Sequence, residues 1–288
     1  MSPDQATLSI VIVNWNTREY LLGALKSIYD APPDYCIQVI VVDNASTDSS
    51  AQAVQDAFPQ VELVASDTNL GYASGNNVGM KLATGDYVLL LNPDVELEPD
   101  ALNRAVAIAK TKDKLSALGA RQITPEGTIQ RSVRGFPKPA SVFYEAIGLS
   151  RLFPRSKLFG AYRMTWFDYK SEMHVDQPMG TFLLIPSPVL KEVGLLDEQF
   201  PIFFNEVDWC YRASLQGYVA WYSPEVELLH YGGGSTRQVK PKMAWESRRS
   251  LLDYYWKHYR GIAYLPIFWI ASAASYIQTK IVSSKRAK

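Results

Sequence analysis

Two residue types that often carry chemistry are scarce in this chain. Its 288 residues include only 2 cysteines and 3 histidines. Cys36 and Cys210 lie far apart and lack the spacing of a metal-binding pair. The sequence therefore disfavours a disulfide scaffold and a cysteine-based zinc site. The low cysteine content fits a reducing, cytoplasmic compartment.

The chain also lacks net charge, because 29 basic residues balance 29 acidic residues. This balance gives no support for a nucleic-acid partner. The charges are unevenly placed, since residues 237–288 hold eleven Lys and Arg against Glu246 and Asp253, a net charge of +9, which leaves −9 on residues 1–236. We therefore expect a globular domain over 1–236 and a basic tail over 237–288 that meets an anionic partner, such as the inner face of the cell membrane.

Long hydrophobic runs are missing near the N-terminus. The apolar run at 8–13 is too short for a signal peptide, and no basic residue precedes it. The segment 261–282 is rich in apolar residues and long enough to span a bilayer, but Pro266 and Lys280 interrupt it. We expect a helical tail lying on a membrane surface, with packing on the domain as the alternative.

Short apolar runs alternate with amphipathic segments through the first 120 residues. The runs predict strands at 8–13, 37–42, 61–65 and 87–91. Helices are expected at 18–29, from Ser46 or Thr47 to 57, after a Gly-rich loop to about 83, and at 99–110. This alternation predicts an α/β fold of Rossmann-like type, with a mostly parallel central sheet and flanking helices. Residues 135–170 predict a loop region with short helices, and strands are expected again at 181–185, 218–222 and 226–230.

Polar residues and glycines follow each of the first four predicted strands. In a parallel sheet these positions meet at one edge, where ligands bind. The candidates for binding a nucleotide-linked donor at this edge are Asn14, Asp43, Asn44, Asn69, Gly71, Gly75, Asn77 and Asn92.

The residue types at this edge suit a sugar nucleotide. A carboxylate such as Asp43 accepts the N–H of a pyrimidine base, and Gly71 and Gly75 permit close approach to a diphosphate. Asp94 offers a hard oxygen ligand to Mg²⁺ or Mn²⁺. His230 lies between a strand end and a Gly-rich run, and it is either a structural histidine or a contact to the metal or the diphosphate. Such an ion stabilises a departing nucleoside diphosphate.

A second acidic group stands at the start of the helix predicted at 204–215. The positive end of the helix dipole stabilises the negative charges of Glu206 and Asp208, so both residues have a structural interpretation that needs no catalytic role. The functional interpretation is a general base that removes the acceptor proton. Either carboxylate can fill that role.

Seven segments in order resemble the glycosyltransferase family 2 enzymes, which have the GT-A fold, and most of all their rhamnosyltransferase-like branch. These segments are SIVIVN (9–14), VVDNASTD (41–48), NLGYASGNNVG (69–79), GDYVLLLNPDV (85–95), MGTF (179–182), VGLLD (193–197) and NEVDWCYR (205–212). The resemblance implies an inverting single displacement. It places Asp43 at the base-binding aspartate, Asp94 at the last aspartate of the DXD-type motif, and Glu206 at the catalytic aspartate. Asn92 replaces the first aspartate of that motif, so it supplies one carboxylate instead of two.

The resemblance also implies partners. The donor is expected to be a dTDP- or UDP-sugar, such as one carrying rhamnose, and the acceptor a lipid-linked glycan in cell-surface polysaccharide assembly. A non-catalytic sugar-nucleotide or glycan binding protein is the main alternative. Nucleotidyl transfer ranks lower because no glycine-rich loop follows the first strand, and the missing G-x-G-x-x-G disfavours an oxidoreductase.

Overall fold

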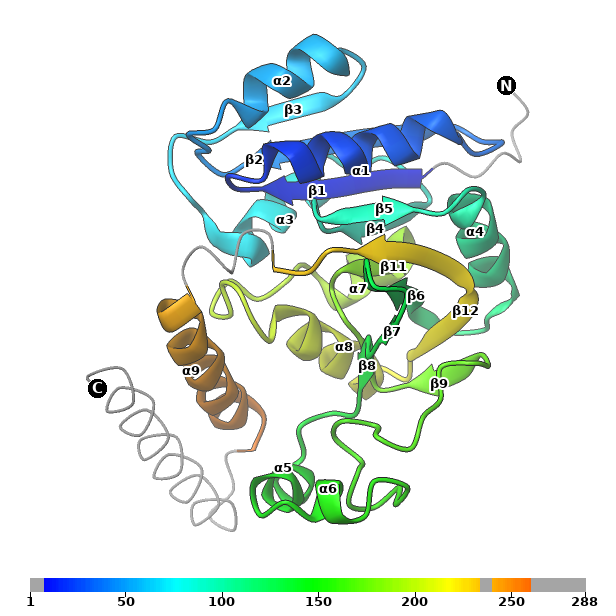
Figure 1. Ribbon diagram of the computed structural model, residues 1–288, viewed down its shortest axis with the longest axis vertical. Coiled ribbons are helices and arrows are strands. Elements are labelled where there is room, and N and C mark those ends of the chain that lie inside the picture. The colour runs from blue at the N-terminus through cyan, green and yellow to red at the C-terminus, as the bar shows by residue number, and fades with distance from the viewer. Residues whose placement is uncertain (1–7, 234–239, 260–288) are drawn as a thin grey trace.

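A computed structural model describes residues 8–233 and 240–259, and side chains throughout these ranges except at residues 240–242 and 244. The first half of the chain follows the predicted alternation (Figure 1). Its elements are β1 (Leu8–Asn14), α1 (Arg18–Asp30), β2 (Ile37–Asp43), α2 (Ser50–Ala57), β3 (Glu62–Ala65), α3 (Gly71–Leu82), β4 (Tyr87–Leu91), β5 (Val95–Leu97), α4 (Ala101–Thr111) and β6 (Leu115–Ile123).

The second half is less regular. It contains β7 (Ile129–Gln130), β8 (Val133–Arg134), α5 (Pro139–Ala146), α6 (Leu149–Leu152), β9 (Met173–Val175), β10 (Gln177–Pro178), β11 (Phe182–Pro186), α7 (Ser187–Val193), α8 (Asn205–Leu215), β12 (Val219–His230) and α9 (Lys240–His258). The predicted loop region therefore holds two short helices, as expected.

The central sheet is parallel in its first half and mixed in its second. Its order is β3-β2-β1-β4-β11-β6-β12-β5. β1 to β4 pair in parallel, whereas β11 runs antiparallel to both β4 and β6. The parallel pairing brings the ends of β1 and β2 into register, with Asn14 opposite Asp43. The predicted functional edge is thus present.

Two hydrophobic cores cover the two faces of the sheet. On β1, Ile10 and Ile12 face the core made with α1 and α4, whereas Val11 and Val13 face the core shared with α3 and α8. All four side chains are buried, which explains why the strand is a continuous apolar run. The sheet is therefore a rigid base for the polar residues at its edge.

The Gly-rich segment after β3 is helical, not the loop that we expected. α3 begins at Gly71, and two of its glycines, Gly75 and Gly79, face β1. A Cβ atom at Gly79 would lie 2.3 Å from Val11 Cγ1, and one at Gly75 would lie 2.8 Å from Val13 Cγ1. These glycines therefore allow α3 to pack closely on β1. The high glycine content of this segment, from which we predicted a loop, reflects this close packing.

The start of α2 and the last strand also differ from the prediction. α2 begins at Ser50, because Ser46 is used elsewhere: its hydroxyl accepts hydrogen bonds from Asn14 Nδ2 and the Asn16 N–H. The two predicted strands at 218–222 and 226–230 form one strand, β12, with an irregularity between Ser223 and Glu227 that contains Pro224. A proline is tolerated at such a bulge because no ladder hydrogen bond is needed there.

Part of the predicted basic tail packs on the domain. α9 lies beside α8, and its Tyr254 and Tyr255 belong to the core that α8 lines (Figure 1). Residues 261–282, for which we expected a membrane-surface helix, lie outside the described residues. None of the helices that the structure describes has the length and hydropathy to cross a bilayer.

Candidate functional site

The ends of β1 and β2 form a buried polar pair. Asn14 Nδ2 donates to Asp43 Oδ2 at 2.8 Å, and the Ser46 N–H donates to Asp43 Oδ1 at 2.9 Å. Asn14 Oδ1 accepts from the Thr17 hydroxyl at 2.6 Å. An ionised carboxylate has about four acceptor positions. Asp43 is thus held in a fixed orientation with acceptor capacity left for a ligand N–H.

Asn44 and Asn69 organise the start of α3. Asn44 Nδ2 donates to the Gly71 carbonyl at 2.9 Å, and Asn69 Oδ1 accepts from the Gly71 N–H at 2.9 Å. Gly71 has φ +82°, a conformation that favours glycine. Its position beside Asn44 keeps this turn at the sheet edge, where we expected donor contacts.

Asn77 and Gly75 have structural roles that the sequence did not predict. The Asn77 side chain is buried and bonded on both ends: Nδ2 donates to the Leu196 carbonyl at 2.9 Å, and Oδ1 accepts from the Leu196 N–H at 3.0 Å. Gly75 lies against Val13, as described above. These contacts account for both residues without a ligand, so we withdraw them from the donor site.

Asp94 and His230 come together because β12 pairs with β5, which places His230 opposite Val95. Both side chains are buried, and His230 Nε2 lies 3.5 Å from Asp94 Oδ1. The other ring nitrogen, Nδ1, is 2.8 Å from Gln130 Oε1. Because an amide oxygen only accepts, Nδ1 carries a proton, and in the neutral ring Nε2 presents its lone pair.

This pair fits a divalent cation. His230 Nε2 is buried and has no hydrogen-bond partner within the described part of the chain. No group of three or more His, Cys, Asp or Glu side chains surrounds any point among the described residues. A cation here would have two protein ligands, which is the usual arrangement where substrate phosphates complete the coordination. Asn92 lies two residues from Asp94, and its N–H donates to the Thr181 carbonyl at 3.0 Å.

Glu206 stands in the first turn of α8, half-buried at the site. Burial raises the pKa of its carboxyl above the usual value. The N–H groups of Glu206 and Val207 and the charge of Arg134 oppose this rise but do not cancel it. A carboxylate with a raised pKa at the edge of a ligand site is suited to act as a general base.

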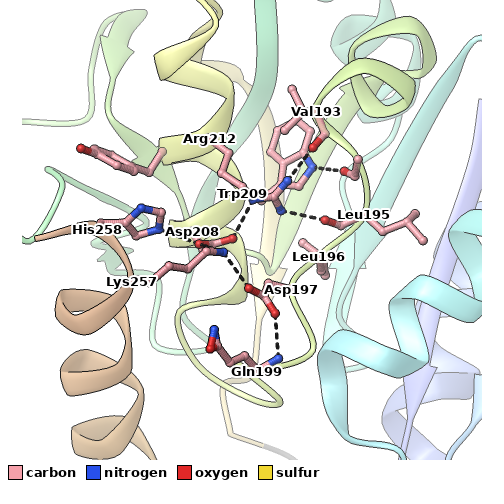
Figure 2. A network of polar contacts seen from close by, with 12 residues as sticks. Val193, Leu195, Leu196, Asp197, Gln199, Asp208, Trp209, Arg212, Lys257 and His258 are labelled. Carbon is pink, nitrogen blue, oxygen red and sulfur yellow. Dashed lines mark hydrogen bonds and ion pairs between the residues drawn. The ribbon is translucent and has the colours of Figure 1, made fainter. Parts of the chain in front are cut away.

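Asp208 has a different environment: it is buried and bonded to Arg212, Lys257 and His258 (Figure 2). Oδ2 accepts from Arg212 at 2.8 Å, and Oδ1 accepts from Lys257 at 2.6 Å and His258 at 2.7 Å. Burial alone would raise the pKa of Asp208, but the hydrogen bonds from His258, Lys257 and Arg212 outweigh it and hold the pKa below its usual value. Asp208 therefore joins α9 to α8, and this geometry argues against its being the base.

The same network fixes the loop that precedes α8 (Figure 2). Arg212 donates to the carbonyls of Val193 at 2.6 Å and Leu195 at 2.7 Å, and Lys257 also contacts Asp197 at 2.6 Å. The segments VGLLD and NEVDWCYR, which are separate in sequence, are thus one structural unit. The contacts among their residues hold α8, the helix that carries Glu206, in place.

Sequence reasoning missed three residues that the structure brings to this edge. Gln130 fixes the ring of His230, and Arg134 and Tyr162 lie close enough to Glu206 to act on it electrostatically. The Arg134 side chain is half-buried, and none of the side-chain hydrogen bonds or ion pairs among the described residues involves it. Gln130 and Arg134 lie in the two-residue strands β7 and β8, and Tyr162 lies in the predicted loop region 135–170. No periodic pattern places these residues, and the basic pair Arg131 and Arg134 was the available signal.

Comparison with known proteins identifies the family. A family model described as glycosyl transferase family 2 matches residues 9–171, which is more than half of the chain. The chain belongs to glycosyl transferase family 2. In this glycosyltransferase, the matched range includes the ends of β1 and β2, Asp94 and Arg134. Glu206 and His230 lie C-terminal to the matched range.

Relatives and solved structures agree with this assignment. The glycosyltransferase is 28% identical to the N-acetylglucosaminyl-diphospho-decaprenol L-rhamnosyltransferase of Mycobacterium tuberculosis (H37Rv), over 80% of this chain and 77% of that protein. It is 23% identical to the rhamnosyltransferase WbbL of Escherichia coli K12, over 81% of this chain and 86% of that protein. These relatives confirm the expected rhamnosyltransferase-like branch.

The fold is shared with a mannosyltransferase from Pyrobaculum calidifontis, solved in complex with GDP-Man and Mn²⁺. The TM-score is 0.59 at 17% identity, covering 96% of this chain and 72% of that one. A likeness at this identity establishes the fold alone. It confirms the predicted GT-A architecture for the glycosyltransferase.

Proposed function

We propose that this glycosyltransferase moves a sugar from a nucleoside-diphosphate donor to an acceptor hydroxyl in one inverting, metal-dependent displacement. The observation that carries the proposal is the Asp94–His230 pair. The Nε2 atom of His230 is buried without a hydrogen-bond partner among the described residues and lies 3.5 Å from Asp94 Oδ1. Burying such an atom is unfavourable unless a ligand completes it.

Asp94 Oδ1 and His230 Nε2 would hold Mg²⁺ or Mn²⁺, with Asn92 beside them. When bound, the ion would stabilise the negative charge that develops on the departing nucleoside diphosphate. Gln130 keeps the ring nitrogen available, because its oxygen accepts from Nδ1. The Mn²⁺ in the mannosyltransferase structure supports a divalent ion as cofactor in this fold.

The donor base and ribose would lie over the ends of β1 and β2. Asp43 accepts the imide N–H of a uracil or thymine ring, and Asn14 holds Asp43 in place. Asn44, Asn69 and Gly71 line the path toward Asp94 as the turn that starts α3. Relatives named as rhamnosyltransferases favour a dTDP- or UDP-linked deoxyhexose such as rhamnose.

Glu206 would remove the proton from the acceptor hydroxyl. Its raised pKa makes the carboxylate a stronger base than an exposed glutamate. The proton moves from the acceptor oxygen to a Glu206 carboxylate oxygen while that hydroxyl attacks the anomeric carbon from the face opposite the diphosphate. Such an attack inverts the configuration. Arg134 offers a positive charge on the same side as Glu206.

We further propose a lipid-linked glycan as acceptor, as in the name of the mycobacterial relative, and a place at the inner face of the cell membrane in cell-surface polysaccharide assembly. The +9 charge of residues 237–288 supports contact with anionic lipid. Sedimentation with vesicles that contain phosphatidylglycerol, but not with vesicles of phosphatidylcholine alone, tests this part of the proposal. Equal or absent binding to both would contradict it.

The function is tested by nucleoside-diphosphate release from UDP-, dTDP- and GDP-sugars, with Mn²⁺ or Mg²⁺ and with EDTA. Wild type is compared with Asp94→Asn and with Asp56→Asn, a control on the exposed face of α2. We expect slow hydrolysis of one donor that EDTA abolishes, Asp94→Asn loses and Asp56→Asn keeps. Equal hydrolysis with EDTA, or in Asp94→Asn, would refute the metal role.

A further inference from the structure

α9 is fixed to the helix that carries Glu206. Lys257 and His258, at the end of α9, contact Asp208 in α8 at 2.6 and 2.7 Å, and Asp208 is fully buried (Figure 2). The Tyr254 ring lies 5.8 Å from the Phe204 ring, directly before α8. These contacts place one side of α9 against the Glu206 helix.

That side of α9 carries a cluster of polar atoms that have no hydrogen-bond partner among the described residues. Eleven buried side-chain nitrogen and oxygen atoms lack a hydrogen-bond partner in the described part of the chain, and four of them are on this one helix. The four are Glu246 Oε1, Ser250 Oγ, Tyr254 Oη and Tyr255 Oη, which we call the α9 polar face. Each of these side chains is more than nine-tenths buried.

Helical spacing explains why these atoms lie together. Glu246, Ser250 and Tyr254 are four residues apart, so they follow one line along the helix, and Tyr255 adjoins its end. Native proteins pair nearly all of their buried polar groups. Four exceptions in a row on one helix therefore indicate a polar partner that the described residues do not supply.

The α9 polar face is electrostatically linked to the proposed base. Tyr255 lies within electrostatic range of Tyr162, and Tyr162 lies within range of Glu206 and Arg134. The Gly135 N–H donates to the Tyr162 carbonyl at 2.9 Å, which holds Tyr162 next to Arg134. Tyr162 thus connects the α9 polar face to the part of the domain that holds Arg134 and Glu206.

We propose that the α9 polar face binds the sugar acceptor of the transfer reaction. Three hydroxyls that both donate and accept, together with one carboxylate, match the hydroxyl and amide groups of a glycan. The acceptor enters between α9 and the domain and satisfies these atoms, while the Asp208 network holds the end of α9 in place. This inference rests on the proposed function, because it assigns the acceptor site of that reaction.

The test uses the full-length protein and three variants that each remove one hydroxyl: Ser250→Ala, Tyr254→Phe and Tyr255→Phe. Tyr222→Phe is a matched control, because Tyr222 is as fully buried as Tyr254 but donates to the Tyr169 carbonyl at 3.0 Å. The probe is N-acetylglucosamine linked by diphosphate to a short polyprenol. Probe affinity is measured with UDP and Mn²⁺ present, and the melting temperature without ligand.

We expect the three α9 variants to bind the probe about fivefold or more weakly, as the loss of one hydrogen bond predicts. Their melting temperatures should equal or exceed that of wild type, because each removes an unsatisfied buried group. Tyr222→Phe should do the opposite, melting lower with unchanged probe affinity. UDP affinity should stay the same in all four variants.

Unchanged probe affinity in all three α9 variants would overturn the proposal, and so would melting temperatures lowered as far as in Tyr222→Phe. A wild-type protein that does not bind the probe would overturn it as well. Failure of the proposed function is distinguishable, because it appears as a loss of metal-dependent donor hydrolysis in wild type without any acceptor.

Discussion

Replacing Asp208 with asparagine separates support of α8 from catalysis. Asp208 is fully buried and bonded to Arg212, Lys257 and His258. Removing one partner of a buried ion pair costs about 3–5 kcal/mol of unfolding free energy. We expect the lower limit, about 3 kcal/mol, because Lys257 keeps Asp197 and Arg212 keeps two carbonyl acceptors. For a chain of this size the melting temperature should fall by roughly 6–12 °C.

The assay is urea unfolding followed by tryptophan fluorescence, with Asp30→Asn as control. Asp30 also pairs with a lysine four residues away, Lys26, but both side chains are mostly exposed. That pair should contribute at most about 0.5 kcal/mol. Folded Asp208→Asn should keep its affinity for UDP and Mn²⁺. An unchanged unfolding midpoint combined with lost sugar transfer would refute the reasoning and indicate Asp208 as the base.

The pH dependence of stability gives an independent check on the same residue. The folded pKa of Asp208 lies below its unfolded value, so the unfolded state binds more protons between the two. Its stabilisation is therefore complete above the usual aspartate pKa and is lost as the pH falls through the folded pKa. Asp208→Asn should lack this loss below about pH 4. Identical acid profiles for wild type and the variant would contradict the network.

Three further perturbations test other parts of the structure. Glu206→Gln should lower kcat by about 10²–10⁴-fold without lowering the melting temperature, because burial disfavours the charge of Glu206 and raises its pKa; retained transfer would exclude it as the base. Gln130→Leu should weaken Mn²⁺ binding by about 10-fold or more, and ¹⁵N NMR should show His230 no longer confined to one tautomer; unchanged spectra would refute the positioning role. Gly79→Ala should cost about 1–3 kcal/mol in urea unfolding, since its Cβ would lie 2.3 Å from Val11 Cγ1; a neutral effect would mean that α3 shifts freely.

The parallel half of the sheet could be predicted because its strands are buried on both faces. β1 is apolar from Leu8 to Val13 except at Ser9, and the short length and β-branched residues of this run favour a strand over a buried helix. β6 escaped prediction because it is rich in small residues and contains Gly119, whose Cβ would lie 2.3 Å from Pro178 Cβ. That contact is tertiary, so no local pattern shows it.

The site was predictable where residues follow strands and unpredictable where contacts are long-range. Asn14, Asp43 and Asp94 could be placed because parallel strands end at one edge. Glu206 and Asp208 are two residues apart on a helix, so they face different directions. That spacing could have shown that only one of them reaches the site, but choosing between them required Lys257 and His258, about 50 residues away.

The irregular segment at 124–172, between β6 and β9, explains the remaining omissions. Arg134 and Tyr162 are brought together by a backbone hydrogen bond between Gly135 and Tyr162. Neither residue lies in a segment with helical or strand periodicity. Their place beside Glu206 depends on short strands such as β8, which is only 2 residues long and pairs with β10.

The most direct test of the metal-dependent mechanism is a titration of Mn²⁺ into the protein with UDP or dTDP, followed by electron paramagnetic resonance. Wild type and Asp56→Asn should bind Mn²⁺ with equal affinity when nucleotide is present. Asp94→Asn and His230→Ala should each bind it at least about tenfold more weakly, because only two protein ligands hold the ion. Equal Mn²⁺ affinity in all four proteins would contradict a metal site at Asp94 and His230.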